Sequence, residues 1–127
     1  MKNLAISLFA FFAIISVGFG QQQQQVQVIK PTIAISEIIF AIQLLDNIEL
    51  RGSEVDALIE VKSVMVPPVI KAQNDKKNVS ETLTLEFKIS TAQNLLGFLQ
   101  RAKMTGADAE RYRKFVEVVV SSAQPKK

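Results

Sequence analysis

Leu83-Thr-Leu-Glu-Phe-Lys-Ile-Ser90 is the stretch of this 127-residue chain that decides the fold. Apolar and polar residues alternate through it, with the apolar ones at the odd positions. Because successive side chains of a strand point to opposite faces, this alternation predicts a half-buried β-strand. Ser90 with Gln93 three residues later is typical of a helix start. The helix expected after it has an apolar side of Leu95, Leu96, Phe98, Leu99 and Ala102.

The chain after this helix predicts a second one. Thr105-Gly106 forms the turn, and residues 107 to about 120 form the helix. The apolar residues of this segment recur at helical spacing, which predicts an inner face of Tyr112, Phe115, Val116 and Val119. The second half of the chain is therefore expected to be a strand–helix–helix unit.

The first half predicts the same order of elements. Residues 26–36 have strand character, interrupted at Pro31, which has no N–H to donate to a ladder. Ser36 is the expected N-cap of a helix over residues 37 to about 49, which ends near Gly52. A second helix is expected from Ser53 to about Met65, stopped by Pro67 and Pro68. Its inward-facing residues would be Val55, Leu58, Ile59 and Val61.

The two halves also match each other without a gap when one is shifted by 54 positions. Ile35-Ser36 then falls on Ile89-Ser90, and Gly52 falls on Gly106. We interpret this as an internal repeat, with units at about 32–66 and 83–120; the alternative is two unrelated helical hairpins that happen to align. The predicted fold is α+β and mainly helical, with a short two-stranded sheet packed on four helices in a single domain, residues 26–120.

The two ends of the chain are expected to lie outside this domain. Residues 1–20 combine Lys2, an apolar run and the small residues of Gly18-Phe-Gly20, which predicts a signal peptide cleaved before Gln21. The alternative is an uncleaved membrane anchor, although its apolar run is shorter than the roughly 18–20 residues that a spanning helix needs. Residues 21–25 form a glutamine-rich leader, and residues 121–127 form a polar tail. We therefore expect a secreted or periplasmic protein that meets a membrane only if the signal is not cleaved.

The composition excludes most catalytic chemistry. The chain has no histidine and no cysteine, so it cannot form a Ser-His-Asp triad, a cysteine nucleophile or a histidine-ligated zinc site. Its densest group of acids is Glu54, Asp56 and Glu60, which we interpret as the solvated start of a helix. We predict no enzyme activity, no catalytic residue, no cofactor and no metal site.

One candidate interaction surface lies on the expected helix 37–49. Ile39, Phe40 and Leu44 extend its apolar side well around the helix. Three interpretations fit this width: burial in the core, an interface with a protein partner or a second copy, and a groove for an apolar ligand.

A second candidate surface is basic and flanks Gly106. It consists of Arg101, Lys103, Arg111, Arg113 and Lys114. An anionic glycan or a lipid headgroup would suit it, and ordinary solvated helix surface is the alternative. Export and the low net charge of +3 disfavour nucleic acid. The sequence thus predicts a small exported non-catalytic interaction or structural protein, with a protein partner or a homodimer, and alternatively a carrier of a small apolar ligand or lipid.

Overall fold

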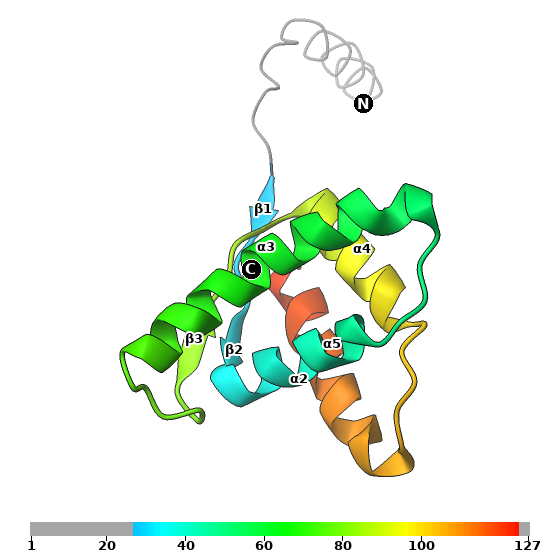
Figure 1. Ribbon diagram of the computed structural model, residues 1–127. Coiled ribbons are helices and arrows are strands. Elements are labelled where there is room, and N and C mark those ends of the chain that lie inside the picture. The colour runs from blue at the N-terminus through cyan, green and yellow to red at the C-terminus, as the bar shows by residue number, and fades with distance from the viewer. Residues whose placement is uncertain (1–26, 125–127) are drawn as a thin grey trace, which may run out of the picture.

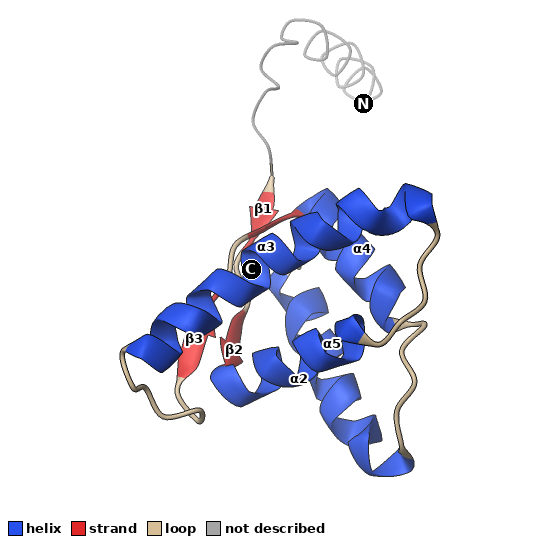
Figure 2. Cartoon of the chain, in the orientation of Figure 1, coloured by secondary structure: helices blue, strands red, loops and turns tan. Residues whose placement is uncertain are grey.

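The computed structural model describes residues 27–124 as a mainly helical α+β domain (Figures 1 and 2). Four helices cover a short two-stranded ribbon, which confirms the predicted fold class. The predicted signal peptide, the whole of the predicted leader and the last three residues of the predicted tail lie outside the described residues. In chain order, the elements are β1 (Val28–Ile29), β2 (Thr32–Ala34), α2 (Ile35–Asp46), the 3-10 turn η2 (Gly52–Glu54), α3 (Val55–Asn74), β3 (Thr82–Thr84), β4 (Phe87–Lys88), α4 (Ile89–Leu99), the 3-10 turn η3 (Gly106–Asp108) and α5 (Ala109–Ser122).

The ribbon is antiparallel and keeps one register over its whole length. β1 pairs with β4, and β2 pairs with β3. Between these two short ladders the backbone N–H of Leu85 donates to the carbonyl oxygen of Pro31 at 3.0 Å. Pro31 cannot return that hydrogen bond, because its nitrogen carries no hydrogen. The proline therefore divides the ribbon into two ladders without changing its register.

The ribbon has one buried face and one solvent face. Ile29, Ile33, Leu85 and Phe87 are buried. The residues between them are mostly exposed, and across the ribbon the hydroxyl oxygens of Thr32 and Thr84 lie 2.8 Å apart. This alternation is the one that the sequence predicts for residues 83–89, and it holds one face of the ribbon against the helices.

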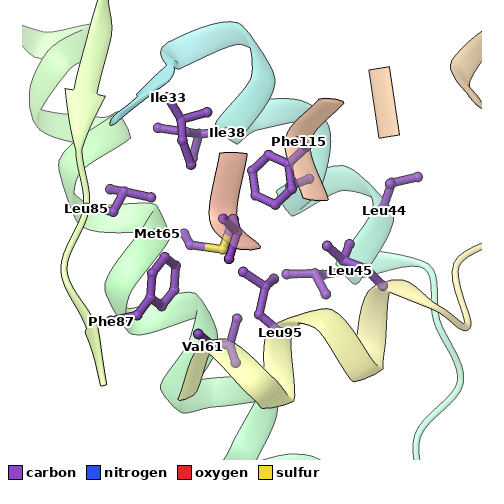
Figure 3. Packing of buried hydrophobic residues seen from close by; sticks show 14 of the residues in the cluster. Ile33, Ile38, Leu44, Leu45, Val61, Met65, Leu85, Phe87, Leu95 and Phe115 are labelled. Carbon is purple, nitrogen blue, oxygen red and sulfur yellow. The ribbon is translucent and has the colours of Figure 1, made fainter. Parts of the chain in front are cut away.

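Both halves of the chain contribute to a single core (Figure 3). The cluster combines Phe87 of the ribbon with side chains from all four described helices; those labelled in Figure 3 include Leu45 of α2, Val61 and Met65 of α3, Leu95 of α4 and Phe115 of α5. α3 contacts α4, and α2 contacts α5. The second helix of each half therefore packs on the first helix of the other half.

Corresponding elements begin 54 residues apart. α2 and α4 begin at Ile35 and Ile89, and α3 and α5 begin at Val55 and Ala109. The first backbone N–H of α2 and that of α4 each donate to a carbonyl oxygen next to the strands of the other half. Ile35 donates to Glu81 at 2.9 Å, and Ile89 donates to Gln27 at 3.2 Å.

These hydrogen bonds explain why the predicted N-caps are wrong. α2 begins at Ile35, after Ala34, and Ser36 lies inside the helix without capping it. α4 likewise begins at Ile89, so that Ser90 is its second residue. The ribbon backbone already accepts hydrogen bonds from N–H groups that a capping side chain would otherwise satisfy.

The predicted end of α3 at the prolines is also wrong. α3 continues through Pro67 and Pro68 to Asn74. A proline inside a helix removes one backbone hydrogen bond and costs about 3 kcal/mol. Beyond the prolines, Val69 and Ala72 are buried in the core, and this packing supports the last turns of the helix.

Candidate interaction surface

The longest of the described helices, α3, carries a second apolar face that points to solvent. Val55, Ile59 and Ile70 are 42 %, 60 % and 50 % exposed, and Val66 is half-buried. At 3.6 residues per turn these four side chains fall within about 60° of one another around the helix axis. They form one line about 22 Å long, which we call the α3 stripe. Figure 1 shows α3 crossing the full width of the described domain.

The neighbouring face of α3, centred about 110° away around the helix axis, holds the residues that the core requires. Val61, Met65 and Val69 are at most 5 % exposed. The prediction that Val55 and Ile59 face inward is therefore wrong, whereas Leu58 packs against the core and Val61 is buried in it, as predicted. Within residues 27–124, α3 has more apolar surface than the core covers.

The corresponding positions of α5 show that the fold does not need an apolar stripe there. Fifty-four residues after Val55, Ile59 and Val66 stand Ala109, Arg113 and Val120. Arg113 is exposed and pairs with Glu117 at 3.8 Å on its own helix. A charged residue thus occupies the place of Ile59 on α5, whose inner residues Phe115 and Val119 are buried. The packing of such a helix therefore does not require an apolar residue at that position.

The candidate surface Ile39, Phe40 and Leu44 lies mostly in the core. Phe40 is 6 % exposed and Leu44 is 9 % exposed, while Ile39 is partly buried against them. The Arg111 guanidinium covers the Phe40 ring, at 4.3 Å from its centroid. Of the three interpretations of this broad apolar side, core burial describes these residues; an exposed interface built from all three does not.

The candidate basic surface is divided into separate ion pairs. Arg101 binds the Glu54 carboxylate with two guanidinium nitrogens, Arg111 binds Glu37 at 3.2 Å, and Arg113 binds Glu117. The ion pairs of the described part of the chain include neither Lys103 nor Lys114. All five side chains are exposed, but three of the charges are compensated locally.

The Arg101–Glu54 pair connects the two halves of the chain. Arg101 follows α4, and Glu54 ends the 3-10 turn before α3. The hydrogen bond from Arg101, together with one from the Arg51 backbone N–H at 2.9 Å, lowers the pKa of Glu54 from 4.5 to about 2. The same carboxylate raises the pKa of Arg101. The pair thus fixes the start of α3 against the end of α4.

A pocket of about 290 Å³ lies between β2 and α5. Its apolar lining comes from Ile33, Ala34, Phe115 and Val118, and its charged lining comes from Glu37, Arg111 and Lys114. A second pocket, of about 420 Å³, lies between α3 and β4. Most residues that line it stand 54 positions from a residue that lines the first pocket. There Glu60 takes the place of Lys114 and Glu86 takes that of Thr32. The two pockets therefore differ in charge.

Two further features concern metal ligands and membrane-spanning helices. No three acidic, histidine or cysteine side chains come together there as metal ligands, and no helix among them is long and apolar enough to cross a membrane. Comparisons with protein-family models, curated proteins and solved structures gave no match.

Sequence reasoning missed the α3 stripe because it ended the helix at Met65. That end leaves Val66 and Ile70 outside the predicted helix and places Val55 and Ile59 among its inward-facing residues. Continuing the helical spacing past Pro67 reveals the stripe at once, because apolar residues at 55, 59, 66 and 70 share one side of a helix.

Proposed function

We propose that this protein is a small exported, non-catalytic interaction protein, and that the α3 stripe is the surface through which it forms a homodimer. One observation carries the proposal: three strongly exposed apolar side chains and a half-buried fourth lie in line on α3, where α5 has Arg113. Contiguous apolar surface of this kind marks contact sites on soluble proteins. The signal-like residues 1–20 support export.

The acidic residues support a non-catalytic role. Glu37 and Glu54 are each bound by an arginine, and Glu60 lies 3.4 Å from the Lys88 ammonium. A carboxylate that serves as a general acid needs its pKa raised towards the working pH, whereas the pKa of Glu54 is lowered. The acids therefore suit structural ion pairs better than proton transfer.

The experiment is sedimentation velocity of the protein purified from a host that exports it, combined with its intact mass. We expect a mass that begins at Gln21 and a monomer–dimer equilibrium that depends on concentration. The Ile59→Arg variant should be monomeric at concentrations where the original chain is dimeric. Because Arg113 occupies the corresponding place on α5, the thermal midpoint of the variant should stay nearly unchanged.

The matched control is Val120→Arg. Val120 is 41 % exposed and corresponds to Val66, but it lies on α5, away from the α3 stripe. This variant should dimerise like the original chain. A chain that stays monomeric at every concentration, or an Ile59→Arg variant that dimerises normally, contradicts the proposal.

We also propose that the two halves arose by duplication of one strand–helix–helix unit. The 54-residue spacing of helix starts and of the ribbon hydrogen bonds supports this origin. The test is an alignment of the halves in related chains. Matches that accumulate at this spacing support duplication, and halves that align no better than unrelated hairpins contradict it.

A carrier of a small apolar ligand with an acidic headgroup is the second candidate. It is favoured by the β2–α5 pocket, where the apolar side chains of Phe115 and Val118 lie beside Lys114. Native mass spectrometry of the exported protein distinguishes the two roles. Extra mass from a bound lipid that is lost in Lys114→Glu would favour the carrier, and bare protein would disfavour it.

A further inference from the structure

We infer that two copies of this chain pair through their α3 stripes in an antiparallel arrangement, about a twofold axis that passes between Lys62 and Ser63. The inference rests on the proposed homodimer and specifies its geometry. Its basis is the spacing of the stripe residues along α3, the chemistry at the centre of the stripe, and the distribution of charge between the two ends of the helix.

The stripe is symmetric about its own midpoint. Val55 and Ile70 lie equally far from the midpoint between Lys62 and Ser63, and Ile59 and Val66 do so as well. In an antiparallel pair, Val55 therefore lies opposite Ile70 of the second copy, and Ile59 lies opposite Val66. A twofold interface requires this self-complementarity, since each copy presents the same patch to the other.

The centre of the stripe allows two helices to approach closely. Ser63 is small and exposed, and its hydroxyl already donates to the Glu60 carbonyl oxygen at 2.7 Å. Of the charged side chains on α3, that of Lys62 lies nearest the axis, and its ammonium is bound by the Asp46 carboxylate of α2. Lys62 thus brings a compensated charge to the interface rather than a free one.

The charges on α3 favour the antiparallel direction over the parallel one. Asp56 lies in its first turn, and Lys76 and Lys77 follow its C-terminus. None of these three takes part in an ion pair of the described residues, whereas Glu60 is paired with Lys88 and Lys71 with Asp75. Antiparallel pairing places the acidic end of one helix beside the basic end of the other, whereas parallel pairing places like charges together. The opposed helix dipoles act in the same direction.

The size of the stripe sets the expected strength of the dimer. Stable interfaces bury about 1,200–2,000 Å² in total, and smaller ones belong to weak or transient pairs. A single line of four apolar residues is a narrow contact. We therefore expect dissociation in the micromolar range, so that monomer and dimer coexist at ordinary laboratory concentrations.

The absence of cysteine from the chain permits a direct test with single-cysteine variants. Ser63→Cys places a thiol next to the axis, where two copies can form a disulfide under mild oxidation. Val55→Cys or Ile70→Cys alone should give almost no linked dimer, because equal positions of the two copies would lie about 22 Å apart, well beyond disulfide reach. A mixture of these two variants should form the mixed disulfide dimer.

Glu117→Cys is the matched control, because Glu117 is the exposed α5 residue that corresponds to Ser63. It should stay unlinked, which measures disulfides formed by random collision. Sedimentation velocity of each reduced variant shows that the dimer itself persists.

The outcomes of these experiments test the antiparallel geometry separately from the proposed homodimer. Rapid linking of Ser63→Cys and of the mixture, with little linking of each partner alone, supports the antiparallel pair. A dimer in which Ser63→Cys stays unlinked, or in which Val55→Cys links alone as fast as Ser63→Cys, overturns the geometry but leaves the homodimer. A monomer at all concentrations overturns both.

Discussion

α3 and α5 occupy corresponding places in the two halves of the chain. Their side chains match in character on one face only. Their inner faces match in character: Val61 corresponds to Phe115 and Met65 corresponds to Val119, and all four are buried. Their outer faces differ, since α3 has Ile59 where α5 has Arg113. The shared core thus constrains the inner face of each helix, while the outer face is free to take on a separate role.

The two helices also differ in length at a defined point. α5 ends at Ser122, which corresponds to Pro68 of α3, whereas α3 continues to Asn74. The continuation carries Val69 and Ala72 into the core and Ile70 to the surface. The longer helix therefore extends both the core and the exposed stripe, even though it contains the two prolines.

The largest effect on the free energy of unfolding is expected on the inner faces, where the side chains of α3 and α5 match in character. Phe115→Ala should lower the free energy of unfolding by about 3–5 kcal/mol and Met65→Ala by about 2–5 kcal/mol, because each leaves a cavity in the one core. Arg113→Ala, on the outer face, should change it by less than about 0.5 kcal/mol. Urea unfolding measures all three. If only Met65→Ala is costly, α5 is not an equal part of the core.

The matching faces are also what the sequence predicts well. The alternation from Leu83 to Ile89 predicts the buried face of the ribbon, and helical spacing predicts Phe115 and Val119 as inward residues. These signals are local, because one period of a strand or helix decides which side a residue takes. The order of elements and the fold class follow from the same signals.

A smaller effect, an increase in the free energy of unfolding, is expected near the point where α3 continues beyond the length of α5. Pro67 is exposed, and Pro67→Ala restores a backbone N–H to the middle of α3. It should raise the free energy of unfolding by about 1–3 kcal/mol. Ser121→Ala, at the corresponding position in the last turn of α5, should change it by at most about 0.5 kcal/mol. Thermal and urea unfolding measure both, and a destabilised Pro67→Ala would show that the proline makes contacts that the helix needs.

The features that the sequence does not predict depend on contacts between distant residues. Local propensity places a helix end at Pro67, but the burial of Val69 and Ala72 by other elements outweighs that propensity. The same holds for the basic group. Arg101 and Glu54 are 47 residues apart, and no local pattern shows that they pair. The sequence therefore groups five basic residues into one surface, although acidic side chains compensate three of them in the fold.

The smallest predicted effect concerns the ion pair that one half has and the other lacks. The position corresponding to Arg101 is Asn47, which has no charge to offer Asp108, the counterpart of Glu54. Because the pKa of Glu54 is lowered from 4.5 to about 2 in the folded chain, its contribution to stability is present above pH 4.5 and is lost as the pH falls towards 2.

Glu54→Gln should therefore lose less stability than the original chain when urea unfolding is followed from pH 5 down to pH 2. Asp108→Asn is the control and should keep the acid sensitivity of the original chain. Both groups of the Arg101–Glu54 pair are partly exposed, so the difference should be modest and should shrink as salt is added. Parallel stability curves for Glu54→Gln and the original chain at low salt would mean that solvent screens the pair, and that this ion pair makes no difference to the stability of the two halves.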